Sequence, residues 1–486
     1  MLLPFAEYRP DVADYQGASI KAATNVVPRG DGYGPFKSFV VFTSALPAAC
    51  RGFFYARNDT GSITVFAGTS TRLYRLNNTD FAWTDVSAGG SAYTAPPSTA
   101  HWRFAQFGNF VIAVQPNVAP QVYNLASSTE FAALGGSPPQ ASYVSVVGRF
   151  VVLTGLTSNP YRIHWSGLNA ATTWTSGTNS SDFQDLPDGG VVRGVAGGEY
   201  GAIFQESTIR RMTYIPGSPL IFAIERVSED VGLLAPYSLM STGNQIFFLA
   251  AQGFMRMSVG GTPEPIGKER VDRTFLADYD NGALQLIIGA TDPEASRVYF
   301  AYKSQTGQVG LFDKLLPYDY ALNRWGSVIN ASGEYLSTLA RPGLTLENLD
   351  SISGSIDALT FSLDDVSTAA LSKLSAVNSA HKLGFYAGDN LEATIDTPEQ
   401  SLDDRRVRVK GIRPITDAAT CFGSLSTRET VQETAVYSAE QAVNARGVCP
   451  ANVSTRLARG HLRIPAGTSW SYATGIEPAF GQEGKR

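Results

Sequence analysis

The chain has 486 residues, a formal net charge of −5 at pH 7, 17% charged residues and 11% aromatic residues. An acidic chain with scattered basic residues lacks the basic patch typical of nucleic-acid-binding domains, which argues against sequence-specific DNA or RNA binding. The low charge and the 47 glycines favour strands and turns over helices, so we predict an all-β protein.

The three cysteines, Cys50, Cys421 and Cys449, are far apart in the sequence. Their spacing matches neither a disulfide framework nor a zinc site. We therefore expect reduced thiols and a reducing compartment, and a Cys421–Cys449 bridge stays open as the alternative. The N-terminus lacks the regions of a secretory signal peptide, and no apolar run is long enough to cross a bilayer. No direct membrane insertion is predicted.

Residues 1–45 are predicted to form an irregular N-terminal arm, or platform segment. Pro4, Pro10, Pro28 and Pro35 interrupt any long element in it. Residues 18–27 are amphipathic and are expected to form a short strand or a single helical turn. Such an arm depends on contacts with the rest of the chain for its order.

From residue 46 the chain repeats one unit about every 40–50 residues, the length of a four-stranded propeller blade. Each unit contains a turn, a largely apolar run and a further short strand. Six copies are visible, at residues 63–76, 107–125, 147–166, 197–215, 242–258 and 295–313. Four glycines hold equivalent positions in successive copies: Gly108, Gly148, Gly198 and Gly243.

The apolar runs at 110–114 and 246–250 predict central blade strands that are buried on both faces. The run at 72–76 alternates instead, which predicts a strand closer to solvent. We predict a β-propeller of about six blades over residues 46–370. Residues 330–364 are expected either to add a seventh blade or to close the ring.

Residues 371–486 are predicted to form a small C-terminal β domain. A short helix is expected at 365–377, a hairpin at 381–400, and a bulge near Gly411-Ile412 where the alternation of residues 405–415 slips. Residues 429–445 fit either a polar helix or a long strand.

No motif predicts a catalytic, cofactor-binding or metal site. The four histidines lack partners at metal-ligand spacing and are expected to be packed or rim residues: His101, His164, His381 and His461. The tryptophans expected to pack in the core are Trp165, Trp174, Trp325 and Trp470.

Because propellers include glycosidases and sialidases, carboxylate pairs are the one catalytic arrangement to consider. The candidates that lie close in sequence are Asp182, Asp185, Asp188 and Glu206. Residues 167–174 look like a degraded form of the turn motif of sialidase blades, where it is structural. We therefore predict that the protein is not an enzyme; a propeller that binds or cleaves host surface polysaccharide stays the alternative.

Several phrases in the sequence identify a family. They are PFAEYRPDVADYQGAS near the N-terminus, HWRFAQFGNFVIAVQPNVAPQVYN at 101–124, GGEYGAIFQESTIRRMTY at 197–214, PIGKERVDRTF at 265–275 and HLRIPAGTSWSYATGIEP at 461–478. In these the chain resembles the tail nozzle proteins of short-tailed bacteriophages, also called packaged-DNA stabilisation or tail-tube proteins. The resemblance spans nearly the whole chain and is weakest at 335–380.

The resemblance implies a structural virion protein that is made in the host cytoplasm and resides in the phage tail. Such proteins form a homohexamer below the adaptor, the head-to-tail connector ring. The ring surrounds the channel through which genomic double-stranded DNA leaves, and it carries the tail needle or tip and the tail fibres.

Two expectations about the assembled ring follow. Six acidic protomers would give an acidic channel, which would repel the phosphate backbone and let DNA slide without sequence-specific binding. Residues 182–188 are expected to form a loop that contacts a neighbouring subunit.

Overall fold

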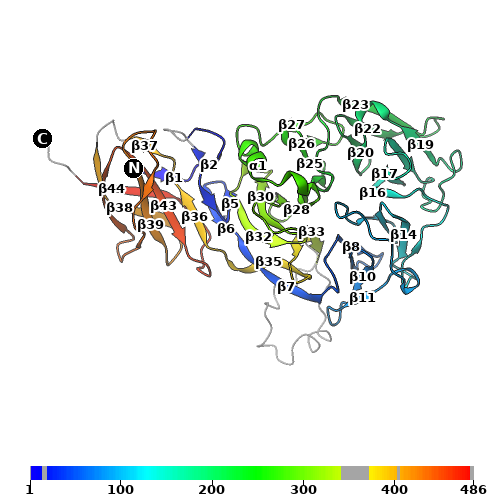
Figure 1. Ribbon diagram of the computed structural model, residues 1–486, viewed down its shortest axis with the longest axis horizontal. Helices are drawn as coiled ribbons and strands as arrows, with labels where there is room; N and C mark the ends of the chain where they lie inside the picture. The colour runs from blue at the N-terminus through cyan, green and yellow to red at the C-terminus, as the bar shows by residue number, and fades with distance from the viewer. Residues whose placement is uncertain (1, 14–18, 341–371, 402–405, 482–486) are drawn as a thin grey trace.

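The computed structural model describes residues 2–13, 19–340, 372–401 and 406–481. Nearly all regular structure in these ranges is β, as predicted, and α1 (Asp272–Asp278) is their one α-helix. Two lobes lie side by side: a β-propeller and a β-sandwich that carries both chain termini (Figure 1).

The propeller contains seven antiparallel sheets within the described residues. The first four blades follow one another along the chain, and each uses four consecutive strands. Blade 1 has β8 (Phe53–Arg57), β9 (Ile63–Gly68), β10 (Leu73–Leu76) and β11 (Trp83–Asp85). Blade 2 has β12 (Arg103–Phe107), β13 (Phe110–Gln115), β14 (Val118–Asn124) and β15 (Ala132–Ala133). Blade 3 has β16 (Ala141–Val147), β17 (Phe150–Leu156), β18 (Arg162–Trp165) and β19 (Asp182–Asp185). Blade 4 has β20 (Val192–Ala196), β21 (Gly201–Gln205), β22 (Ile209–Tyr214) and β23 (Phe222–Ser228).

The remaining blades complete the ring. Blade 5 has β24 (Met240–Thr242), β25 (Gln245–Ala250), β26 (Gly253–Ser258) and β27 (Glu264–Pro265). Blade 6 has β28 (Ile288–Asp292), β29 (Arg297–Tyr302), β30 (Phe312–Asp319), β31 (Arg324–Trp325) and the additional β32 (Ile329–Gly333). Blade 7 has β33 (Tyr335–Ala340), β34 (Ser372–Val377), β35 (Lys382–Asn390) and, at its outer edge, β7 (Lys37–Ala45). The propeller therefore has the seventh blade that the sequence left open beside six, and this blade also closes the ring. Of the residues expected to add it, 341–364 lie outside the described residues.

The seam is a pairing between distant parts of the chain. β7 runs antiparallel to β35, with Val40 opposite Phe385 and Phe39 opposite Tyr386. The first strands of the blades contact one another around the axis, and β33 of blade 7 contacts β8 of blade 1. A circular array of blades with one composite sheet needs both ends of the propeller sequence for its stability.

The local sequence explains the blade strands. The second strand is mostly apolar in blades 1 to 6, and β13 and β25 are buried along almost their whole length, as predicted. β10 is also mostly buried, which is contrary to the expectation from its alternation. Gly108, Gly148 and Gly243 have φ of 55–58° in the turn between the first and second strands, where a residue without Cβ meets no steric penalty.

The sandwich is built from both ends of the chain. One sheet has the order β42-β38-β44-β6-β5, with β1 beside β44; the other has the order β4-β36-β43-β39-β40, with β37 and β41 alongside. The N-terminal strands are β1 (Leu3–Pro4), β4 (Ala23–Thr24), β5 (Val26–Arg29) and β6 (Gly32–Pro35), and β2 (Glu7–Tyr8) and β3 (Ser19–Ile20) form a small separate pair. The C-terminal strands are β36 (Ala393–Asp396), β37 (Gln400–Ser401), β38 (Val407–Thr416), β39 (Phe422–Arg428), β40 (Val436–Tyr437), β41 (Gln441–Ala442), β42 (Cys449–Thr455), β43 (Leu457–Ile464) and β44 (Ala473–Gly481).

This topology corrects the expected domain boundaries at 45/46 and 370/371. Residues 2–13 and 19–35 are not an irregular arm, because β1, β4 and β6 pair with β36 or β44 of the sandwich; residues 1 and 14–18 of the expected arm lie outside the described residues. Residues 372–390 belong to blade 7, so the C-terminal part of the sandwich begins near Ala393. The propeller is thus inserted between the two halves of one sandwich domain.

Three local expectations for the C-terminal region also change. Residues 372–377 form a strand and not the end of a helix, while 365–371 lie outside the described residues. Residues 381–400 are not a hairpin, because β35 and β36 belong to different sheets. Residues 429–445 contain only the two-residue strands β40 and β41. The expected bulge is confirmed by the register shift between Val409 and Gly411.

One apolar cluster joins the two lobes. It contains Val26 and Tyr33 of the N-terminal strands, Trp325 of blade 6, and Ile395 and Ile476 of the sandwich. Polar contacts secure the same junction. Asp11 accepts hydrogen bonds from the first-turn amides of α1, at 2.8 Å from both Arg273 N and Thr274 N. Asn25, at φ 58°, donates to the Glu392 carbonyl and accepts from Asn330 N. Shared apolar core and directional bonds make the two lobes one continuous body.

Candidate functional site

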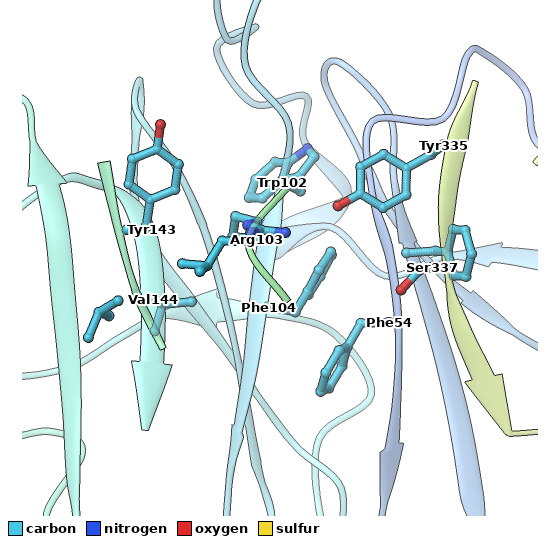
Figure 2. Close-up of a pocket in the computed structure, with 12 residues that line it drawn as sticks. Phe54, Trp102, Arg103, Phe104, Tyr143, Val144, Tyr335 and Ser337 are labelled. Carbon is cyan, nitrogen blue, oxygen red and sulfur yellow. The ribbon is translucent and has the colours of Figure 1, made fainter. Parts of the chain in front are cut away.

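A cavity near the axis of the propeller is called here the axial well. Its volume is about 190 Å³, and first strands of the blades supply most of its wall. The lining residues are Phe53, Phe54, Trp102, Arg103, Phe104, Tyr143, Val144, Gly194, Val195, Leu239, Tyr335 and Ser337. Figure 2 shows Arg103 near the centre, between Tyr143 on one side and Tyr335 on the other.

Arg103 is the one charged residue in this wall. Its guanidinium carbon lies 5.2 Å from the centre of the Tyr237 ring, a cation–π contact, and its Nη2 donates a long hydrogen bond of 3.4 Å to the Pro236 carbonyl. No ion pair joins it to a carboxylate of the described residues. A guanidinium has five N–H donors, and none of those of Arg103 binds a carboxylate of the described residues.

The aromatic side chains of the well are ordered by packing. The rings of Phe54 and Phe104 stack with centroids 5.9 Å apart and an interplanar angle of 9°. Trp102 is fully buried and donates from Nε1 to the Thr69 carbonyl at 2.7 Å. Phe54 and Phe104 lie on the first strands of blades 1 and 2, and Trp102 directly precedes the first strand of blade 2.

A second cavity of about 300 Å³ shares Tyr143 with the axial well. Its charged residue is Arg193, which donates to Glu206 Oε1 at 2.7 Å and to the carbonyls of Leu233 and Leu234 at 3.0 Å. No carboxylate lines either cavity among the described residues. The axis of this acidic chain therefore has a locally positive character.

His101 supports the wall of the well as a neutral residue. It is 2% exposed, its ring meets those of Tyr237 and Tyr335 edge-on, and its Nε2 lies 2.9 Å from the Gln285 carbonyl. Burial lowers the pKa of His101 to about 3, helped by the nearby Arg51 charge. The neutral ring then donates from Nε2 to Gln285, so His101 is a packed residue, as expected.

The other histidines are also engaged in structural contacts. His164 Nε2 lies 3.1 Å from the Trp174 carbonyl, and burial lowers its pKa. His381 Nδ1 is 2.5 Å from Glu334 Oε1, and His461 Nδ1 is 2.5 Å from Asp396 Oδ1. No group of three or more potential metal ligands occurs in the described ranges. The four tryptophans named from the sequence are buried, as predicted.

The four candidate carboxylates do not converge on a cavity. Asp182 and Asp185 lie on β19, the outer strand of blade 3, and not in a free loop. Their partners are internal: Ser176 for Asp182, Arg162 for Asp185, Arg210 and Arg226 for Asp188, and Arg193 for Glu206. Arg162 forms a bidentate pair with Asp185, at 2.6 and 2.9 Å, and holds the pKa of that carboxyl low. These contacts stabilise the blades.

The residues of the axial well were not among the candidates from the sequence. Arg103 begins the strand Arg103–Phe107, and its sequence, RFAQF, does not say what the Arg103 side chain faces. Cys50, Cys421 and Cys449 are buried free thiols in the structure. The side chains of Cys421 and Cys449 are hydrogen-bonded to each other, which lowers the pKa of Cys421 and raises that of Cys449. The Cys421–Cys449 bridge stays a prediction.

Two buried titratable groups predict opposite contributions to the pH dependence of stability. The folded-state pKa of His101, about 3, lies below its usual 6.5. The neutral ring therefore contributes to the free energy of unfolding above pH 6.5, and this stabilisation is lost as the pH falls. Burial raises the pKa of Asp272 from 3.8 to about 6, so its contribution is present below pH 3.8 and is lost as the pH rises to about 6. We expect urea unfolding to show that His101→Gln weakens the loss of stability below pH 6.5.

Asp272→Asn tests the opposite pH dependence, the loss of stability as the pH rises. Asp272 accepts from Phe254 N at 3.1 Å in a cradle formed by Gly253 and Gly267, with Asp11 as the nearest further acid. The variant should be destabilised relative to wild type more at about pH 4 than at about pH 7, because only the carboxylate loses its proton in this range. Parallel stability curves for wild type and both variants would contradict the assignment.

No helix within the described segments is long and apolar enough to span a membrane. No family model matches the chain, and no curated protein matches it. Solved structures with a similar fold include the extracellular domain of the BT4673 hybrid two-component system from B. thetaiotaomicron, at 10% identity and a TM-score of 0.40, covering 77% of this chain and 41% of that one. BamB from Moraxella catarrhalis is 11% identical with a TM-score of 0.35, covering 75% and 96%. YCF48 bound to D1 peptide is 11% identical with a TM-score of 0.34, covering 56% and 80%.

The chain thus spans less than half the length of the BT4673 domain. At these identities and TM-scores the likeness carries no argument about this chain. Its own sheet topology makes it an all-β protein whose larger lobe is a β-propeller.

Proposed function

We propose that the protein is a structural subunit of the tail nozzle of a short-tailed bacteriophage. In this role six copies form a ring below the adaptor, and the ring surrounds the channel for genome retention and ejection. The ring also carries the tail needle or tip and the fibres. The proposal begins from the resemblance of the N-terminal, 197–214 and 461–478 segments to nozzle proteins.

The observation that carries the proposal is the continuous body formed by the two lobes. The propeller is closed by a strand from before its first blade, and the sandwich is closed by strands from both chain ends. The chain passes from one lobe to the other twice, between β6 and β7 and between β35 and β36. Each passage joins two hydrogen-bonded strands directly, without a long linker. A subunit that must keep its shape beside identical copies while DNA passes under pressure benefits from such rigidity.

The exposed apolar residues support a role in assembly. On the sandwich they include Val431, Val436 and Tyr437 around β40, which are 46–67% exposed. Val436 lies at the edge of its sheet, where backbone groups are free to pair with a further chain. Clustered apolar residues beside a sheet edge are typical of protein–protein contacts.

The test is mass photometry of the chain alone and together with its adaptor ring. We expect six copies of the 52.0 kDa chain on each adaptor ring. Val436→Asp should reduce the occupancy by about tenfold or more, because it places a charge in an apolar contact. Val309→Asp is the control, since Val309 is 89% exposed without this apolar surrounding.

A chain that never joins the adaptor, or joins it in a different number, would overturn the proposed function. Equal occupancy of the adaptor ring by Val436→Asp and Val309→Asp would show that β40 is not part of the interface. The alternative, a propeller that binds or cleaves host surface polysaccharide, has no observation in its favour among the described residues: the four candidate carboxylates pair with Arg or Ser side chains and line neither the axial well nor the second cavity.

A further inference from the structure

We propose that the axial well is a binding site for a small organic anion that consists of one planar ring and a carboxylate. This site is separate from ring assembly, and the inference does not depend on the proposed tail function. Three observations carry it: the charge in the well, its size and the arrangement of its aromatic walls.

The charge of the well is uncompensated. Many other propeller arginines have a carboxylate partner: Arg72 pairs with Asp85, Arg162 with Asp185 and Arg256 with Glu264. Arg103 has none within the described residues, and no carboxylate lines the well around it. The Tyr237 ring, the Pro236 carbonyl and the Tyr335 hydroxyl satisfy only part of its five donors. A planar guanidinium that is free to form two parallel N–H···O bonds selects a carboxylate.

The size of the well fits one ring. Its volume of about 190 Å³ exceeds the ~150 Å³ of an engineered apolar cavity that binds benzene, and the difference accommodates a carboxylate. A nucleotide or an oligosaccharide would be too large for this space. The ligand class is therefore set by volume as well as by charge.

The walls offer an apolar side and a polar side. Phe54 and Phe104 form the stacked apolar pair, and Figure 2 shows both below Arg103. The Tyr335 hydroxyl faces the Arg103 side chain from blade 7, and Ser337 adds a second hydroxyl from the same strand. We infer that the ring of the ligand lies against Phe104 while its carboxylate pairs with Arg103. A hydroxyl on the ring would find a donor or acceptor at Tyr335 or Ser337.

The position of the site makes it depend on the closed ring of blades. Its walls come from blades 1 to 4 and blade 7, so Tyr335 reaches the well only when blade 7 closes against blade 1. A ligand that contacts both sides of this seam would stabilise the closed propeller by mass action.

The test is isothermal titration calorimetry of the full chain with 4-hydroxybenzoate, and with the neutral 4-hydroxybenzamide as the matched probe. We expect saturable binding of the carboxylate with one site per chain and binding of the amide about tenfold weaker or less, because a charge-assisted bidentate pair is lost. Arg103→Met should reduce carboxylate affinity by about ten- to a hundredfold. Arg149→Met is the control, because it makes the same change in net charge at an exposed turn outside the well.

Several results would overturn the inference. They are no binding of 4-hydroxybenzoate at millimolar concentration, equal binding of acid and amide, or full binding by Arg103→Met. Binding of inorganic phosphate alone with the same affinity would equally defeat the role of the aromatic walls. If Arg103→Met does not fold, the acid–amide comparison on the wild-type chain still decides, since it needs no variant.

Discussion

Replacing Gly384 with valine is expected to detach β7 from blade 7 and to destabilise the whole propeller. A Cβ at Gly384 would lie 2.2 Å from the Val40 carbonyl oxygen and 2.6 Å from the Phe39 ring, far inside normal contact distances. The backbone of β7 cannot move aside without losing its ladder of hydrogen bonds to β35. We expect a loss of about 3 kcal/mol or more in the free energy of unfolding, from overpacking and from lost strand pairing.

Urea unfolding measures the change, and limited proteolysis near residues 37–45 reports whether β7 is released. Gly30→Val is the matched control, because a Cβ at Gly30 meets nothing within 4 Å. That variant should unfold like the wild type. Wild-type stability in Gly384→Val would mean that the ring does not depend on β7.

Replacing Glu399 with glutamine is expected to destabilise the sandwich by about 3 kcal/mol, the usual loss when one partner of a buried ion pair is removed. Glu399 is 2% exposed and accepts two hydrogen bonds from Arg428, at 2.7 Å from Nε and 2.5 Å from Nη2. Arg459 Nη2 lies 3.7 Å from Glu399 Oε1, the oxygen that also accepts from Arg428 Nε. The neutral amide would remove the negative charge that faces these two largely buried guanidinium groups.

The contrast is the surface pair of Glu294 and Lys373, whose atoms are 4.0 Å apart and about half exposed. Glu294→Gln should change stability by less than about 0.5 kcal/mol, because solvent screens an exposed pair. Chemical denaturation of both variants at one pH compares them directly. A similar small effect for both would show that Glu399 contributes no more than a surface charge.

The local part of the fold follows from the sequence. Apolar runs such as Phe110–Gln115 predict buried blade strands, because a strand between two neighbouring blades has no solvent face. Gly108 and Gly148 recur at one turn of each unit, because that turn needs a left-handed conformation. Both properties are set by neighbours in the chain, so they could be predicted without the fold.

The pairing of distant segments could not be predicted in this way. Val40 and Phe385 face each other across blade 7, yet nothing near either residue specifies the other. For the same reason the N-terminal segment reads as irregular: its short strands are stable only as edges of sheets supplied by the C-terminal region.

The same distinction between local and long-range properties applies to the candidate site. The sequence by itself determined that the chain is all-β, that its repeats are blades, and that its tryptophans and histidines are packing residues. Only the tertiary structure decided that Arg103 meets no carboxylate of the described residues, that Asp185 and Glu206 are held by Arg162 and Arg193, and that five blades enclose an aromatic well. The physical reason is that strand periodicity fixes which residues share a face, whereas ring closure fixes which faces meet.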